Sequence, residues 1–155
     1  MDTFYQSVAS FCFTLVGLWW AVTQLRLDEW TQSPEKRRLA NTVFLSFLVP
    51  GTMSLAAQVS GDAKWVWQIV FAVAGLSGAA ATVMFIRGTH HAGLFRKARW
   101  LAVALYLAVA AFAWFPEMAG PLQLKPLQVE GLMLALLVFL GAGLAWEFLT
   151  EPRTA

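Results

Sequence analysis

The stretch of sequence that decides the fold is residues 65–86, WVWQIVFAVAGLSGAAATVMFI, in which no residue carries a charge. A helix of about 20 apolar residues spans the hydrocarbon core of a bilayer, which is roughly 30 Å thick. Similar stretches occur elsewhere in the chain, and none has Lys or Arg in its interior. In chain order, the predicted spans are residues 4–25, 39–59, 65–86, 98–115 and 129–149. We therefore expect an all-α integral membrane helical bundle, with residues 1–155 forming a single transmembrane domain.

The composition excludes several other classes of protein. Hydrophobic residues make up 59% of the chain and charged residues 13%, whereas a soluble domain has roughly 45–50% and about 25%. This excess of apolar residues argues against a soluble domain, a disordered chain and a nucleic-acid binder. Cys12 is the single cysteine, so no intrachain disulfide can form. The lipid bilayer is the first partner that the sequence predicts.

The fourth predicted span, residues 98–115, is the weakest because it is short and rich in alanine. A bundle of four spans, with this segment buried or only partly inserted, is the alternative count. Start signals support the neighbouring helices. Ser33-Pro34 is typical of an N-cap followed by proline in the first turn, and Asp62 can cap the third span.

The basic residues predict the orientation in the membrane. With five spans, nine of the eleven Lys and Arg residues fall on one side, which leaves Lys64 and Lys125 on the other. Cytoplasmic loops collect Lys and Arg, so we expect the N-terminus outside and the C-terminus inside. Tryptophans near the predicted span ends, as at the membrane interfaces, agree with this placement. The expected location is a cell membrane, either a plasma membrane or a bacterial inner membrane, with an organelle membrane as the alternative.

Two rows of small and uncharged polar residues follow single helix faces, because their spacing is three or four residues. The row on the first span, called the first-span stripe, consists of Ser7, Ser10, Thr14, Gly17, Ala21 and Gln24. The row on the second span, called the second-span stripe, consists of Thr42, Ser46, Pro50, Ser54 and Gln58. Such residues either pack helices closely together or line a wet path. If they pack helices, the first three spans form the core, with Gly17 and Gly75 at helix contacts and the last two spans outside.

Ionisable residues give little support for catalysis. Glu130 and Glu147 lie near the ends of the last span, so we expect no acid deep in the membrane and no proton-coupled pump. His90 and His91 are adjacent and diverge by about 100° on a helix, so we expect no metal site and no cofactor. We expect the protein not to be an enzyme, because motifs for nucleophilic, metal or nucleotide chemistry are missing. A basic group is expected to contact anionic lipid headgroups and consists of Arg87, Arg96, Lys97 and Arg99.

Two functions are compatible with these patterns. The first is a homo-oligomeric, channel-like permeation protein that uses the two stripes, since a chain this short hardly encloses a pore alone. The alternative is a non-enzymatic accessory or scaffold subunit that docks other membrane subunits through the same small residues. The oligomeric state in mild detergent distinguishes the two.

Overall fold

The protein is a bundle of long α-helices, seen in a computed structural model that describes residues 2–25, 27–28, 33–61, 63–87, 94–118 and 125–150. This part of the chain contains no strand. Four of its helices are long and apolar enough to cross a membrane. The predicted all-α membrane bundle is therefore confirmed. Its helices are α1 (Asp2–Leu25), α3 (Pro34–Val59), α4 (Lys64–Arg87), α5 (Leu94–Trp114) and α6 (Pro126–Thr150).

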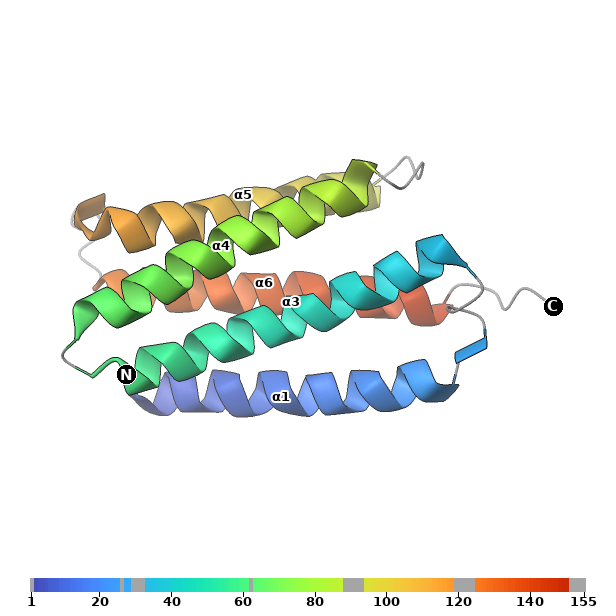
Figure 1. Cartoon of the computed structure of the whole chain (residues 1–155), viewed down its shortest axis with the longest axis horizontal. Helices are drawn as coiled ribbons and strands as arrows, with labels where there is room; N and C mark the ends of the chain where they lie inside the picture. The colour runs from blue at the N-terminus through green and yellow to red at the C-terminus, as the bar shows by residue number, and fades with distance from the viewer. Residues whose placement is uncertain are drawn as a thin grey trace.

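Consecutive long helices run antiparallel along the bundle (Figure 1). The helices α1, α4 and α6 run in one direction, and α3 and α5 run in the other. The central helix is α3, which contacts α1, α4 and α6. This arrangement brings the end of α4 and the starts of α3 and α5 to the same end of the bundle.

The fourth span differs from the others because the apolar part of its helix is shorter. At a rise of 1.5 Å per residue, the 21 residues of α5 extend over about 31 Å. Its apolar part, Arg99–Trp114, covers only about 24 Å. The helix α5 therefore has the length of a span, while its apolar part is shorter than the hydrocarbon core.

The start of α3 follows the predicted signal. The hydroxyl of Ser33 accepts a hydrogen bond from the backbone N–H of Lys36 at 3.4 Å, and Pro34 occupies the first turn. The helix continues through Pro50, whose side chain is buried. Asp62, the predicted cap of the next helix, lies outside the described residues.

Glycine and alanine bring α4 and α5 into the most extensive helix contact of the described chain. A Cβ atom added at Gly75 would lie 2.7 Å from the carbonyl oxygen of Tyr106 and 3.0 Å from the Cβ of Ala110. The expectation that the last two spans pack outside a core of the first three is wrong. Side chains of α5 and α6 form part of that core, among them Val109 and Leu134, which are fully buried.

Gly17 does not take part in this packing, contrary to expectation. It lies on an exposed part of α1, and an added Cβ would meet no atom within 4 Å. The bundle packs α1 against α3 through the opposite side of the helix, where Cys12 and Trp19 are buried. The indole N–H of Trp19 donates to the carbonyl oxygen of Ala40 at 3.0 Å.

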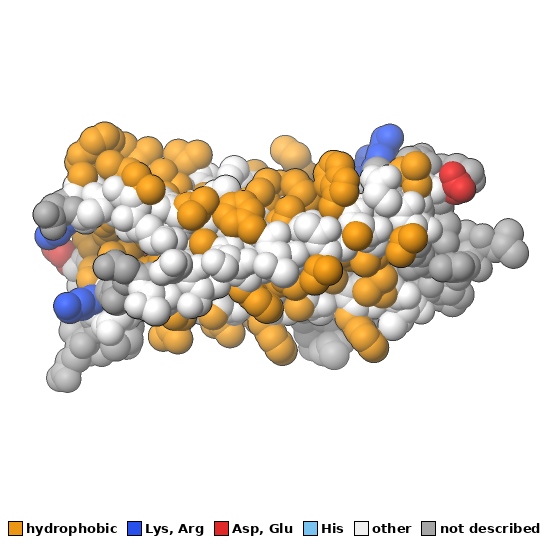
Figure 2. Space-filling model, turned by 90° about the horizontal axis from the view of Figure 1, so that it is seen from below, with side chains coloured by type: hydrophobic (Ala, Val, Ile, Leu, Met, Phe, Trp, Pro, Cys, Tyr) orange, Lys and Arg blue, Asp and Glu red, His pale blue; other side chains and the backbone are white. Residues whose placement is uncertain are grey.

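The outer surface is apolar along the length of the bundle. Figure 2 shows hydrophobic side chains over one side face, with charged side chains near the two ends. Exposed tryptophans lie toward both ends of the helices, as in the belts found at membrane interfaces. They are Trp20, Trp65, Trp100, Trp114 and Trp146.

Candidate functional site

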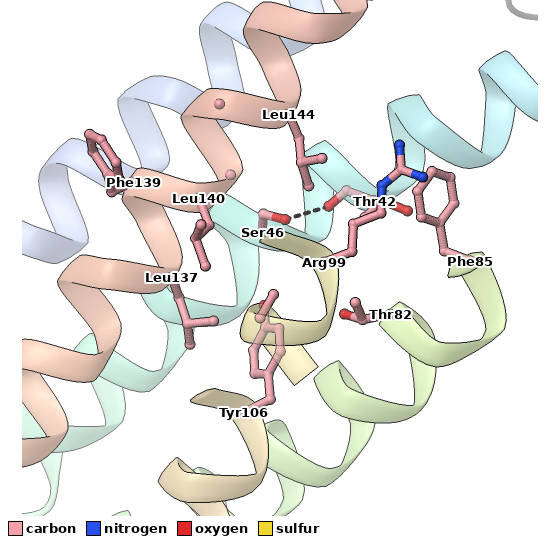
Figure 3. A pocket seen from close by; sticks show the side chains of 13 residues that line it. Thr42, Ser46, Thr82, Phe85, Arg99, Tyr106, Leu137, Phe139, Leu140 and Leu144 are labelled. Atoms are coloured by element: carbon pink, nitrogen blue, oxygen red, sulfur yellow. Dashed lines mark hydrogen bonds between the residues drawn. The ribbon is translucent and has the colours of Figure 1, made fainter. Parts of the chain in front are cut away.

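A cavity of about 130 Å³ lies between α3, α4, α5 and α6 (Figure 3). We call it the Arg99 cavity, because Arg99 is the charged residue among the described residues that line it. Its other polar side chains are Thr42, Ser46, Thr82 and Tyr106. Most of the remaining wall is apolar and is supplied by Phe85, Ala102 and the segment of α6 from Leu137 to Leu144.

Arg99 is buried although it lies near the beginning of α5. Its side chain is 5% exposed, and the guanidinium carbon is 4.7 Å from the centre of the Phe85 ring. A guanidinium above an aromatic face is stabilised by the negative face of the ring. The sequence suggests this inward orientation, because Arg99, Ala102 and Tyr106 are spaced three and four residues apart and share one helix face.

The hydroxyl groups at the cavity donate to carbonyl oxygens of their own helices. Ser46 donates to the carbonyl oxygen of Thr42, and Thr42 donates to that of Arg38, each at 2.8 Å. Thr82 donates to the carbonyl oxygen of Gly78 at 2.8 Å. A hydroxyl that has donated its proton still has lone pairs, so these oxygens remain potential acceptors.

Tyr106 stands at the boundary between two hollows. Its ring packs against Gly78, where an added Cβ would lie 2.5 Å from the ring. The side chain is 4% exposed, and its hydroxyl makes no hydrogen bond within the part of the chain that the structure describes. A second hollow of about 210 Å³ shares Tyr106, Thr42, Ser46 and Thr82 with the Arg99 cavity and extends to Leu45 and Ser77.

The second-span stripe divides into a cavity part and a packed part. Thr42 and Ser46 line both hollows. Ser54, two turns further on, is 0% exposed, and its hydroxyl has no hydrogen-bond partner among the described residues. Gln58 donates its side-chain N–H to the carbonyl oxygen of Ser54 at 3.1 Å. The stripe is therefore not one continuous path within the chain.

The first-span stripe lies elsewhere, on the outside of the bundle. All six of its residues are exposed, on the side of α1 that faces away from α3. Ser7 donates to the carbonyl oxygen of Thr3, and Thr14 donates to that of Ser10, each at 2.8 Å. The structure thus does not bring the two predicted stripes together.

The predicted headgroup cluster is also divided. Arg87 is exposed at the end of α4, whereas Arg99 turns into the bundle. The side chains of Arg96, Lys97 and Glu147, together with the whole of His90 and His91, lie outside the described residues. Among the described residues, no group of three or more His, Cys, Asp or Glu side chains could hold a metal ion.

Glu130 was expected to be a boundary acid, and the structure places it in the interior. It is 0% exposed, and neither carboxyl oxygen has a hydrogen-bond partner among the described residues. Tyr5, on the facing side of α1, donates its hydroxyl to the carbonyl oxygen of Leu127, one turn before Glu130. The spacing of Glu130, Leu134 and Leu137, which share a buried face, is the sequence signal that could have located this acid.

Comparisons of the chain with protein-family models, with curated proteins and with solved structures found no match. The fold and the site therefore define the class of protein by themselves. The chain is a helical membrane bundle in which a mostly apolar cavity, with one buried arginine, lies between α3, α4, α5 and α6.

Proposed function

We propose that the protein assembles into a homo-oligomer through the first-span stripe, and that the assembly forms a channel-like path for water or small uncharged polar solutes. The observation that carries this proposal is the exposure of the whole stripe on a membrane-spanning helix. Small residues let helices of neighbouring subunits approach closely. The same residues, placed around an oligomer axis, give a lining with hydroxyl groups and no fixed charge, which suits uncharged solutes better than ions.

The alternative partner is a different membrane protein. The hydroxyls of Ser7 and Thr14 already donate to their own helix, so these two donors do not need water. The first-span stripe could pack directly against the helix of another subunit, without water between them. This observation favours the accessory or scaffold function, and it makes the identity of the partner the decisive question.

The oligomeric state tests the proposal first. The protein, purified in mild detergent, is expected to run as a defined homo-oligomer in size-exclusion chromatography with light scattering. In a Cys12→Ala background, Ser10→Cys should form disulfide-linked dimers on mild oxidation. Leu18→Cys is the matched control, because Leu18 is exposed on the same helix but outside the stripe. A monomer that co-purifies with another membrane protein, and does not cross-link at Ser10, would support the accessory function instead.

Permeation is tested separately, by stopped-flow swelling of liposomes that contain the protein. Thr14→Cys in the same background should lose its water or glycerol flux after reaction with a bulky thiol reagent. Leu18→Cys should keep its flux after the same treatment. A defined homo-oligomer with no flux above empty liposomes would refute the channel and leave self-association standing.

A further inference from the structure

We propose that the Arg99 cavity binds the anionic headgroup of a single-chain amphiphile, such as a fatty-acid carboxylate, with the acyl chain extending along α6 into the bilayer. The site lies within one chain, so this inference does not depend on oligomerisation. It rests on the cationic side chain, the tyrosine hydroxyl and the apolar wall that meet at this cavity.

Arg99 supplies the charge that selects an anion. A guanidinium has five N–H donors in a fixed, planar arrangement, so Arg99 can keep its contacts within the protein and still donate to a ligand. Carboxylate and phosphate groups match this geometry with two parallel hydrogen bonds.

Tyr106 supplies a second, independent indication of a ligand. Its side chain lines the cavity and is buried, and its hydroxyl donates to no described residue. A phenolic hydroxyl can donate a hydrogen bond to a ligand oxygen. A carboxylate oxygen in the cavity would accept this hydrogen bond. Arg99 and Tyr106 lie seven residues apart on one face of α5, so both can reach the same ligand.

The apolar wall of the cavity would contact the acyl chain of the ligand. Leu137, Leu140 and Leu144 lie along one side of the cavity, as Figure 3 shows. A closed apolar cavity of about 150 Å³ takes up a molecule the size of benzene. The 130 Å³ here can thus hold a headgroup and the first carbons of a chain. The lining also includes Phe139 and Gly143, which are exposed on α6, so the rest of the chain can leave toward lipid.

The position along the bundle agrees with this ligand. Arg99, Phe85 and Thr42 come from the ends of their helices that meet at one end of the bundle. The basic loops of the sequence predict that this end is cytoplasmic, and the cytoplasmic leaflet is rich in anionic lipids. The headgroup would therefore enter from the level where anionic amphiphiles gather.

The test is equilibrium binding of tritiated oleate to the protein in phosphatidylcholine nanodiscs, with empty nanodiscs as the blank. We expect saturable binding, and a ten- to hundredfold loss of affinity in Arg99→Gln, because a hydrogen bond to a charged group is lost. Tyr106→Phe should lose about three- to tenfold. Arg87→Gln, which removes the same charge from an exposed position, should bind within twofold of the unchanged protein.

Competitors separate the possible ligands. Unlabelled oleate should displace the probe, whereas methyl oleate, which has the same chain without the charge, should not. Inorganic phosphate that displaces the probe at the same concentration as oleate would show a small-anion site and overturn the proposal. Absence of saturable binding, or equal binding by Tyr106→Phe and the unchanged protein, would also overturn it. Tyr106→Phe decides the outcome if Arg99→Gln does not fold.

Discussion

Among the described residues, Arg99 and Glu130 are the buried charged side chains, and they differ in what surrounds them. Arg99 lies against an aromatic ring at the edge of a cavity. Glu130 is packed in the bundle without a hydrogen-bond partner among the described residues. A buried carboxylate costs several kcal/mol unless a proton, a counter-ion or hydrogen bonds compensate its charge. Ionisable residues within a span are rare and usually functional.

Glu130→Gln tests whether the acid destabilises the fold. Glutamine has nearly the same shape and carries no charge, so we expect the free energy of unfolding to rise by about 1 kcal/mol. The measurement is thermal unfolding in detergent at neutral pH, followed by tryptophan fluorescence. Glu117→Gln, at an exposed position after α5, is the control. A clear loss of stability in Glu130→Gln would mean that the carboxylate has a partner, such as a bound cation.

At the scale of elements, the sequence predicts where helices lie better than which way they face. Ser33-Pro34 marks the start of α3, and the absence of charge in residues 65–86 marks the extent of α4. The rotation of each helix is harder to predict because lipid is as apolar as the protein interior. Hydrophobicity then does not distinguish the packed face of a helix from its lipid-facing side. A small residue can lie on either side. Gly75 packs against α5 and Gly17 faces outward, although both were expected at helix contacts.

Gly75→Leu and Gly17→Leu separate the fold from assembly. Leucine at position 75 would collide with the backbone of α5 at Tyr106, and overpacking of this kind costs about 1–3 kcal/mol. We expect a lower melting temperature for Gly75→Leu in detergent. Gly17→Leu has open space in the single chain, so we expect it to keep the fold and to weaken self-association measured by light scattering. Equal losses of melting temperature in the two variants would contradict this division.

Thiol labelling tests the division of the second-span stripe. In a Cys12→Ala background, Ser46→Cys borders both hollows and should react with a small charged thiol reagent. Ser54→Cys is enclosed by packed side chains and should react at least tenfold more slowly, because its labelling requires local opening of the bundle. Leu55→Cys reports the accessibility of an exposed neighbour. Equal rates at positions 46 and 54 would indicate a continuous wet path along α3.

At the scale of the whole molecule, the prediction still to be tested is the orientation of the protein in the membrane. The alternation of helix directions places the start of α1 and the end of α6 at opposite ends of the bundle (Figure 1). If all five long helices cross, the termini lie on opposite sides of the membrane. The number of crossings depends on α5, because the charged residue Arg99 lies near the beginning of this helix. Its inward rotation toward Phe85 lets this charge lie inside the bundle rather than in lipid, which favours a full crossing.

A reporter fused after Ala155 should therefore be cytoplasmic, and one inserted at Gly61, in the short turn between α3 and α4, should be external. Paired alkaline phosphatase and green fluorescent protein fusions measure this, because the phosphatase is active outside and the fluorescent protein inside a bacterial inner membrane. The expectation follows from nine of eleven basic residues on one side. Fusions at Gly61 and Ala155 that report the same compartment would show that α5 does not cross. In that case the four-span count would hold, and Arg99 would have to be explained by a segment that enters the bundle without crossing the membrane.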